Sequence, residues 1–417
     1  MKNKHLQRFS VVVLILLLHN TNSFSQDTAR IFSYNLLNYS GGEPKNQYFR
    51  KSIGYADPDI LVVCEMISQA GVNDLLANVM NYYTPGIYSA GTFLDGPDTD
   101  NAIFYKTIDY TFVSNTPVHT DLRDINMFTL IHNLSRDTLR LFEVHLKASS
   151  GADNEAQRLI EVNAVRAVTN NFPAGTEFMI LGDFNIYNST ESCYLRMLQI
   201  DAGNEGHFID PYSLPGVWNQ AAYSQYHSQS TRVRSFGGGA TGGMDDRFDF
   251  ILNSKSLTEE GRIKYIPGSL KPFGNDGNHY NDSINKRPNT SVPDSIADAL
   301  HYASDHLPVY ALYKFDVHPS AIRSISSSVP EDFKLYQNYP NPFNPGTIIN
   351  YELKVRNNVT LKVYDQNGKE VSLLVNKRQN PGNYKLEFNA QNLSSGVYFY
   401  TLRVGNSVQT KSMIVLK

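Results

Sequence analysis

Cysteine and tryptophan are scarce in this 417-residue chain, which has two of the first and one of the second. Two cysteines, Cys64 and Cys193, cannot build a disulfide scaffold or a cysteine-rich zinc or iron–sulfur site, although one disulfide between them stays open. Charged residues make up 18% of the chain and the net charge is −3, which excludes a strongly basic nucleic-acid coat. Tyrosine and phenylalanine are abundant, so the chain can bury a sizeable core.

The first 25 residues have the pattern of a secretory signal peptide. Three basic residues precede an uninterrupted apolar run from Val11 to Leu18, and Ser23 and Ser25 provide small residues for cleavage. This run is too short to span a bilayer, which takes roughly 20 apolar residues, although a short N-terminal anchor is the alternative. The sequence therefore predicts an exported monomer with no stable membrane span.

Charge divides the rest of the chain in two. Residues 26–320 hold 22 Lys and Arg against 34 Asp and Glu, a net charge of −12, whereas residues 321–417 hold 12 against 6, a net charge of +6. A serine-rich stretch, Ser324 to Ser328, lies at the break. We therefore predict a signal peptide at 1–25, a large domain at 26–318, a linker at 319–332 and a small domain at 333–417.

The small domain opens with a proline-rich segment. Three prolines between Pro340 and Pro345 exclude a helix or a central strand there. Beyond them, alternating apolar residues separated by turn signals predict the strands of a small β-sandwich, at 349–353, 359–364, 384–388, 397–404 and 413–416.

Three motifs of this domain, YPNPFNP, VYDQNGKEV and GVYFYTL, closely resemble the C-terminal sorting domain of the type IX secretion system of Bacteroidetes. The resemblance implies an all-β immunoglobulin-like sandwich that the type IX secretion machinery recognises. It also implies passage through the periplasm and outer membrane to the cell surface or exterior. A generic adhesive or carbohydrate-binding sandwich is the alternative, but it leaves the proline-rich opening unexplained.

The large domain alternates strand-like and helix-like segments. Apolar runs predict strands at 30–36, 60–64, 102–105, 139–144, 178–181, 248–252 and 309–315. Apolar residues at helical spacing predict a helix at 154–168. Such a mixture indicates a layered α/β fold with sheets inside and helices outside.

Polar side chains stand at the ends of these strands, where loops begin and chemistry is usually found. The set comprises Asn35, Glu65, His145, Asp183, Asn185, Asp249, Asp305 and His306. Their carboxylate and amide oxygens are hard ligands that suit Mg²⁺, Mn²⁺ or Ca²⁺ and do not suit zinc. The two histidines add a general base and a donor to developing negative charge. The set therefore predicts metal-assisted hydrolysis of a phosphate ester.

Two motifs in this set, GDFN at 182–185 and SDHLPV at 304–309, resemble the endonuclease/exonuclease/phosphatase superfamily, which includes pancreatic deoxyribonuclease. PDI before Glu65 and RFDFIL at 247–252 strengthen the resemblance, which spans nearly all of residues 30–315. The resemblance implies a four-layer α/β/β/α sandwich, in which two packed sheets lie between outer helices.

The same resemblance implies a role for each polar residue. Asn35 and Glu65 would hold a divalent metal, Mg²⁺ or else Mn²⁺ or Ca²⁺, and Asp305 would complete the metal or phosphate cradle. His306 would act as general acid or base, oriented by Asp249. A carboxylate on one ring nitrogen fixes the tautomer, so that only the other nitrogen serves the substrate.

The resemblance also places residues around the phosphate. Asp183 would lie close to the attacking water, Asn185 would orient the phosphate, and His145 would donate to a phosphate oxygen. Three further side chains are weaker candidates for substrate contact: Arg158, His227 and Arg232. A helix salt bridge is the alternative for Arg158, and a hydrated loop is the alternative for the other two.

The fold alone does not select the substrate. Export favours extracellular DNA, the commonest large phosphodiester there, and leaves RNA open. A sphingomyelinase-like lipid phosphodiesterase is one alternative, but it would need an exposed apolar loop that this sequence does not offer. A catalytically silent surface module is the other alternative, and it conflicts with the complete set of metal and histidine positions. We therefore expect a secreted, metal-dependent endonuclease.

Overall fold

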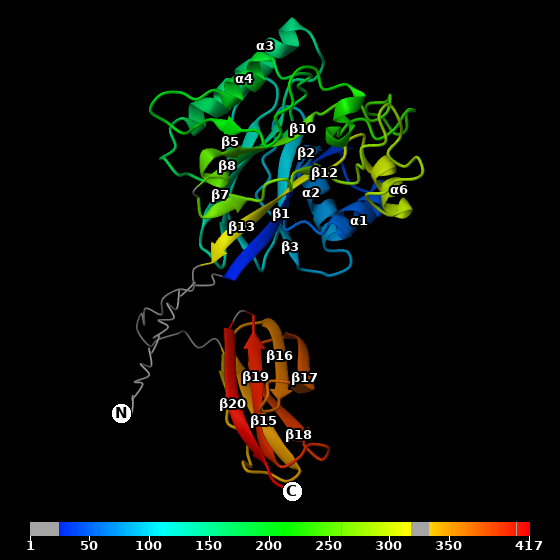
Figure 1. Cartoon of the computed structure of the whole chain (residues 1–417). Coiled ribbons are helices and arrows are strands. Elements are labelled where there is room, and N and C mark those ends of the chain that lie inside the picture. Colours follow the sequence, from blue (N-terminus) through cyan, green and yellow to red (C-terminus); the bar gives the residue numbers. More distant parts are fainter. Residues whose placement is uncertain (1–24, 260, 318–332, 406) are drawn as a thin grey trace, which may run out of the picture. The chain divides into compact units, whose positions relative to one another are not determined.

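The structure, a computed structural model, describes residues 25–259, 261–317, 333–405 and 407–417. They belong to two compact units, within Met1–Pro319 and Ser320–Lys417, and each is described by itself (Figure 1). The predicted signal peptide, apart from Ser25, and the predicted linker 319–332 lie outside the described residues. Within the described part of the chain, no helix is both long and apolar enough to cross a membrane.

Two β-sheets form the centre of the first unit. The first sheet contains β1 (Ser25–Tyr39), β2 (Ile60–Met66), β3 (Tyr88–Ala90), β4 (Asp100–Lys106), β11 (Ile263–Tyr265), β12 (Lys271–Pro272) and β13 (Val309–Val317). Its strand order is β11-β13-β1-β2-β4-β3, with β12 beside β13. The second sheet contains β5 (Tyr110–Val118), β6 (Ile125–His132), β7 (Thr138–His145), β8 (Phe178–Asp183), β9 (Phe208–Ile209) and β10 (Asp249–Ser254). Its strand order is β5-β6-β7-β8-β10-β9.

Alternation along β1 shows how the sequence builds the layers of this unit. Ala29 and Ile31 belong to the core between the two sheets, whereas Phe32 and Tyr34 belong to the core between the first sheet and its helices. Successive side chains of a strand point to opposite faces, so a strand buried on both faces needs apolar residues at nearly every position. This is why the strand ends, with their polar residues, stand out in the sequence.

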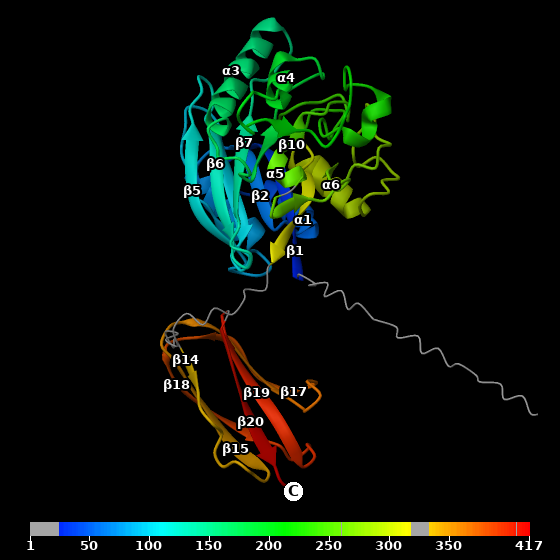
Figure 2. The same cartoon turned by 60° about the vertical axis from the view of Figure 1, so that its left-hand side comes forward.

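Helices cover the outer face of each sheet (Figures 1 and 2). The first sheet carries α1 (Lys45–Ala56), α2 (Gln69–Leu75), the π-helical turn η1 (Leu76–Met80) and α6 (Asp294–Ala303). The second sheet carries α3 (Ala152–Thr169) and α4 (Ser192–Leu198). Short helices occur at η2 (Ala221–Tyr226) and α5 (Lys255–Thr258). The predicted four-layer α/β/β/α sandwich is confirmed, and the predicted helix 154–168 lies within α3.

The second unit is the predicted small β-sandwich. One sheet contains β14 (Phe333–Leu335), β15 (Gly346–Leu353) and β18 (Gly382–Asn389). The other contains β16 (Asn357–Tyr364), β17 (Glu370–Gln379), β19 (Gly396–Val404) and β20 (Ser407–Val415). In β16, Val359, Leu361 and Val363 are buried in the shared core while the residues between them are partly exposed. This alternation with a period of two is the pattern from which the sequence predicts a strand at 359–364.

Strand register in the first unit brings the polar strand ends to one edge of the sandwich. Parallel pairing sets Asn35 of β1 opposite Cys64 of β2, directly before Glu65. Parallel pairing of β7 with β8 sets His145 opposite Asp183, and antiparallel pairing of β8 with β10 sets Asp183 opposite Asp249. Neighbouring strands lie roughly 4.8 Å apart, so these side chains share one small region.

Candidate active site

Asp183, at the end of β8, is the centre of the cluster. The residue is 2% exposed, and its Oδ2 accepts a hydrogen bond of 3.1 Å from Asn35 Nδ2. The Nε2 atoms of His306 and His145 lie 3.5 and 3.7 Å from the same oxygen. Burial raises the pKa of Asp183; the charge of His306 opposes this, but the charges of Asp249 and Glu65 raise the pKa further, to about 7. The carboxylate therefore has a strong tendency to take a proton.

Glu65 is held in an unusual backbone conformation at the end of β2. Its φ of +57° is rare for a residue with a side chain, and Leu37 and Asn38 opposite have φ of +52° and +50°. Two donors fix the carboxylate: Asn35 Nδ2 at 2.9 Å from Oε1 and the backbone N–H of Asn38 at 2.8 Å from Oε2. Strand alternation alone does not determine this orientation; the irregular register of β1 with β2 contributes to it.

His306 and Asp249 form a buried pair. Nδ1 of His306 lies 2.7 Å from Oδ2 of Asp249, and the side chains are 2% and 0% exposed. Burial opposes a charge on the ring, but the carboxylates of Asp249 and Asp183 outweigh it and hold the pKa of His306 well above its usual value. With Nδ1 occupied by Asp249, Nε2 is the nitrogen that faces Asp183.

His145 is the uncharged member of the cluster. Burial lowers the pKa of His145 well below its usual value, and the positive charges of Arg123 and His306 act in the same direction. Its Nε2 lies 3.8 Å from Oε1 of Glu65, in addition to its approach to Asp183. The pKa values of the two histidines are therefore shifted in opposite directions, and the Asp249 carboxylate, 2.7 Å from His306 Nδ1, is the main cause that raises the pKa of His306.

Asp305 lies under the glycine-rich loop 237–243. Its Oδ2 accepts a hydrogen bond of 2.6 Å from the backbone N–H of Ala240, while its buried Oδ1 lacks a partner within the described part of the chain. Gly239 has a φ of +78°, and a Cβ there would lie 2.6 Å from the Asp305 carboxyl carbon. Only glycine permits this approach. Ser304 Oγ, one residue earlier, donates to the Asn35 carbonyl at 2.7 Å and ties Asp305 to β1.

Asn185 contacts Asp183, and Gln229 contacts His306. Asn185 follows the end of β8 with a φ of +51°, so strand alternation does not extend to it. Its backbone N–H donates to Asp183 Oδ1 at 3.1 Å and its Nδ2 donates to the Leu146 carbonyl at 3.2 Å. Gln229 was not among the site residues predicted from the sequence, yet its amide nitrogen lies 2.6 Å from His306 Nε2. The polar segment 226–232 was its one signal, and that signal does not single out Gln229.

Arg158 and His227, which the sequence suggested as substrate contacts, make hydrogen bonds inside the protein. Arg158 is fully buried, and its guanidinium donates to Glu191 at 2.8 and 3.0 Å and to the carbonyls of Lys147 and Ser149. His227 is also fully buried, with Nε2 2.9 Å from the Trp218 carbonyl. Both side chains are engaged in internal bonds, which favours a structural role in place of the predicted phosphate contact.

Arg232, the third of these candidates, lies on the Asp305 side of the cluster. It is 1% exposed, its Nη1 donates to the Phe236 carbonyl, and the charge of Asp305 acts on it. Among the residues that the structure describes, its Nε and Nη2 have no hydrogen-bond partner. A buried guanidinium with unused donors is costly unless a ligand supplies acceptors.

The residues present fit a magnesium-like cation. The described residues include no group of three His, Cys, Asp or Glu side chains placed to hold a metal by themselves. Mg²⁺ does not require such a cage, because it commonly keeps several waters and takes one or two carboxylates together with substrate phosphate. Glu65 and the unpartnered Oδ1 of Asp305 are such carboxylates. Asn35 turns its amide nitrogen to Glu65, and its oxygen accepts from the Leu37 N–H at 2.9 Å, so Asn35 orients the ligand.

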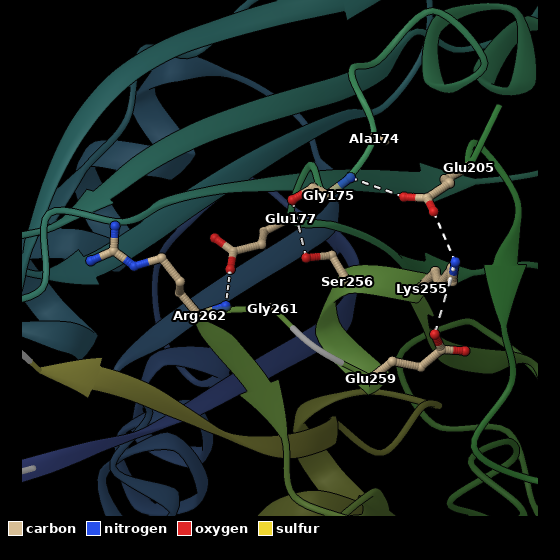
Figure 3. Close-up of a pocket in the computed structure, with 9 residues that line it drawn as sticks. All are labelled: Ala174, Gly175, Glu177, Glu205, Lys255, Ser256, Glu259, Gly261 and Arg262. Atoms are coloured by element: carbon tan, nitrogen blue, oxygen red, sulfur yellow. Dashed lines mark hydrogen bonds and ion pairs between the residues drawn. The ribbon is translucent and has the colours of Figure 1, made fainter.

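A pocket of about 530 Å³ lies away from the catalytic candidates (Figure 3). It adjoins Glu177, directly before β8, and Lys255, directly after β10, whereas the catalytic candidates lie at the other ends of these strands. Figure 3 shows Lys255 between Glu205 and Glu259, at 2.9 and 3.9 Å. Glu177 accepts the backbone N–H groups of Arg262 and Ile263. Lys255 is thus paired with two glutamates and Glu177 with two backbone donors, so this pocket offers no set of groups comparable to the polar strand ends.

Comparisons with known proteins concern each unit separately. Residues 337–416 match the family model "Secretion system C-terminal sorting domain", which indicates type IX secretion to the cell surface or the extracellular space. No curated protein matches the chain in sequence.

The first unit is similar to solved structures of the endonuclease/exonuclease/phosphatase fold. They include truncated TDP2 from Caenorhabditis elegans (14% identity, 69% of this chain and 97% of that chain, TM-score 0.43). The human Nocturnin catalytic domain is similar over 69% of this chain and 97% of its own (17% identity, TM-score 0.42). An endonuclease/exonuclease/phosphatase family protein from Bacteroides thetaiotaomicron is similar over 70% of this chain and all of its own (14% identity, TM-score 0.43). At these identities and scores, nothing about the chemistry follows from the likeness.

Proposed function

We propose that this chain is a secreted, divalent-metal-dependent phosphodiesterase, and that its substrate is extracellular DNA cut as by an endonuclease. One observation carries the proposal: the buried His306–Asp249 pair faces Asp183, and Asp183 shares the Asn35 amide with Glu65. The proposal assigns to this cluster a proton-exchanging group, a carboxylate beside the attacking water and a cation ligand. Together these three functions are suited to the hydrolysis of a phosphate diester.

Each residue has a role that follows from its surroundings. Asp183, whose pKa is raised by burial, accepts a proton from the water that attacks phosphorus in line with the leaving oxygen. His306 donates a proton from Nε2 to the leaving oxygen, because Asp249 occupies Nδ1. His145, neutral, donates a hydrogen bond to a phosphate oxygen on which charge builds up.

A divalent cation fits beside these residues. Glu65 and Asp305 would hold it, Asn35 would keep Glu65 in place, and Asn185 would orient the phosphate. When bound, such a cation offsets the negative charge of the phosphate. Mg²⁺ is our first choice, since few carboxylates converge there and Mg²⁺ binds substrate phosphate readily.

The test is nicking of supercoiled plasmid by the purified chain in Mg²⁺, Mn²⁺ or Ca²⁺. We expect relaxed and linear products that disappear when a chelator is added. His306→Ala should lower the rate by a factor of about 10² to 10⁴, the usual contribution of general acid–base catalysis. His132→Ala is the matched control, because His132, at the end of β6, is also a buried histidine paired with an aspartate, Asp27.

Two outcomes would contradict the proposal. If folded protein leaves plasmid and RNA intact in all three metals but releases phosphocholine from sphingomyelin vesicles, the enzyme is a lipid phosphodiesterase. If it hydrolyses no phosphodiester, including bis(p-nitrophenyl) phosphate, the module is catalytically silent. If His306→Ala nicks plasmid as fast as the native protein, the proposed activity stands but the role assigned to His306 is wrong.

A further inference from the structure

A small apolar cavity lies beside the catalytic candidates and has no role in the chemistry described above. Its volume is about 190 Å³, and its lining comprises Leu37, Pro44, Lys45, Tyr48, Arg232, Phe236, Gly237 and Tyr302. Leu37 is the residue before Asn38, whose N–H binds Glu65, and the loop from Phe236 leads to Ala240, whose N–H binds Asp305. One wall of the cavity is therefore continuous with the proposed cation site.

Aromatic rings form a second wall. The rings of Tyr48 and Tyr302 stack with centroids 5.2 Å apart and planes inclined by 30°. Phe236 meets Tyr302 edge to face at 5.1 Å and is 44% exposed. A group of rings that is partly open to solvent offers both faces and edges to a flat ligand. Stacking of a base on an aromatic side chain contributes roughly 1–3 kcal/mol, whatever the base.

Two residues with cationic side chains, Lys45 and Arg232, are among those that line this cavity. Arg232 is almost fully buried, and its Nε and Nη2 have no hydrogen-bond partner among the residues that the structure describes. Lys45 Nζ donates to the carbonyls of Leu36 and Leu37, and burial lowers its pKa to about 8. Both cations would gain from an anion, and a phosphate provides oxygen acceptors for the Arg232 fork.

We propose that this cavity holds the nucleotide next to the scissile phosphate, with its base against the rings of Tyr48, Tyr302 and Phe236 and its own phosphate on Arg232 and Lys45. The inference rests on the proposed function and specifies the substrate as a chain of nucleotides. A lipid or sugar phosphodiester has no base for the rings. The unused donors of Arg232 favour the nucleotide over a purely apolar occupant.

The test measures binding, which needs no turnover. Calorimetry in Mg²⁺ compares the whole chain with four probes: dAMP, deoxyadenosine, inorganic phosphate and hexyl phosphate. We expect dAMP to bind at least tenfold more tightly than each of the others, because it alone supplies both groups. Arg232→Gln and Lys45→Gln should each weaken dAMP binding about tenfold and leave deoxyadenosine binding within twofold. Tyr302→Leu should weaken dAMP and deoxyadenosine alike and leave phosphate binding unchanged.

Several outcomes would overturn the inference. Hexyl phosphate binding as tightly as dAMP would mean that the rings accept an alkyl chain and favour a lipid-like occupant. Unchanged dAMP affinity in folded Arg232→Gln and Lys45→Gln would mean that the nucleotide binds elsewhere. Thermal unfolding of each variant checks its fold. Lys45 is partly exposed and Arg232 is buried, so Lys45→Gln should disturb folding less than Arg232→Gln and keeps the test valid if Arg232→Gln misfolds. Plasmid nicking without dAMP selectivity would sink this inference alone, whereas dAMP selectivity without nicking would sink only the activity.

Discussion

Replacing Asp249 by asparagine tests the most specific geometry in the site. The change retains the shape of the side chain and removes its charge from a position 2.7 Å from His306 Nδ1, where both groups are buried. A neutral amide no longer stabilises the charged imidazole and no longer fixes the proton on Nδ1. General acid–base catalysis contributes a factor of about 10² to 10⁴, so kcat should fall by about 10³, which corresponds to about 4 kcal/mol in the barrier.

The pH profile distinguishes this role from a structural one. The pKa of His306 is held well above its usual value by Asp249 and Asp183 against the opposing effect of burial. Without the Asp249 charge the pKa of His306 falls, so the decline of kcat/KM that follows loss of the His306 proton should move to lower pH. The assay is hydrolysis of bis(p-nitrophenyl) phosphate across pH, with Asp245→Asn as the matched control because Asp245 bonds to Asn219 instead.

A double variant completes the design. Asp249→Asn combined with His306→Ala should be no slower than His306→Ala alone, because the carboxylate acts through the ring and residues that act as a unit are not additive. The reasoning is refuted if folded Asp249→Asn keeps its rate within about threefold of the native protein and its pH profile does not move.

Three further predictions concern the loop and the framework. Gly239→Ala should lower kcat/KM at least tenfold, because its Cβ would lie 2.6 Å from the Asp305 carboxyl carbon. Gly238→Ala is the control: its φ is +94° and no atom lies within 4 Å of the added Cβ, so it should show only the backbone strain that both variants share. Plasmid nicking compares the two variants. Arg158→Met strands the buried Glu191 charge and should lower the free energy of unfolding in urea by about 3–5 kcal/mol, against less than about 1 kcal/mol for the exposed Lys286→Met; equal losses would contradict the buried pair. Burial would raise the pKa of Asp74, but hydrogen bonds from Asn46, Gly42, Tyr39 and Asn78 outweigh it and lower the pKa to about 2. Because the pKa of Asp74 is lower in the folded protein than in the unfolded chain, the carboxylate stabilises the fold above pH 3.8, and this stabilisation is lost as the pH falls toward 2. Asp74→Asn should therefore remove about 1 kcal/mol of acid-sensitive stability after solvent screening. Acid-unfolding curves of identical shape for the native protein and the variant would refute the prediction.

The layers and the strand ends could be predicted from the sequence because they depend on local signals. Continuous apolar runs identify strands buried on both faces, and the sandwich follows once helices cover each sheet. His145 and Asp183 follow such runs directly, and strand register then brings them together. The proline-rich opening and the alternation of β16 are equally local, which is why the small sandwich was evident.

Arg158 and Arg232 show where local signals end. Both are arginines in polar surroundings of the sequence, and both are almost fully buried in the fold. Arg158 meets Glu191, which lies 33 residues later, so its donors are consumed by a partner that no spacing rule identifies. Arg232 keeps two donors unused beside a cavity because no described residue reaches them. The difference between a structural and a ligand-binding arginine lies in long-range packing, and sequence alone does not contain it in readable form.

Gln229 and Glu65 show a second limit, which concerns backbone conformation. Gln229 approaches His306 through a loop without regular structure, so no periodicity points to it. Glu65 lies near the end of β2, where the sequence predicts it, yet the direction of its side chain depends on a φ of +57°. Such conformations cost of order 1–3 kcal/mol and persist where surrounding contacts fix them. The hydrogen bonds from Asn35 and Asn38 are those contacts.

The net charge of −12 on residues 26–320 does not conflict with a polyanionic substrate. Charges beyond about 8 Å are largely screened at physiological ionic strength, so the phosphate responds to the nearest groups. Near the site those groups alternate in sign: Glu65, Asp183 and Asp305 form a region suited to a cation, and Lys45 and Arg232 border it. A phosphate chain crossing this border would meet a cation held by carboxylates and then two basic side chains.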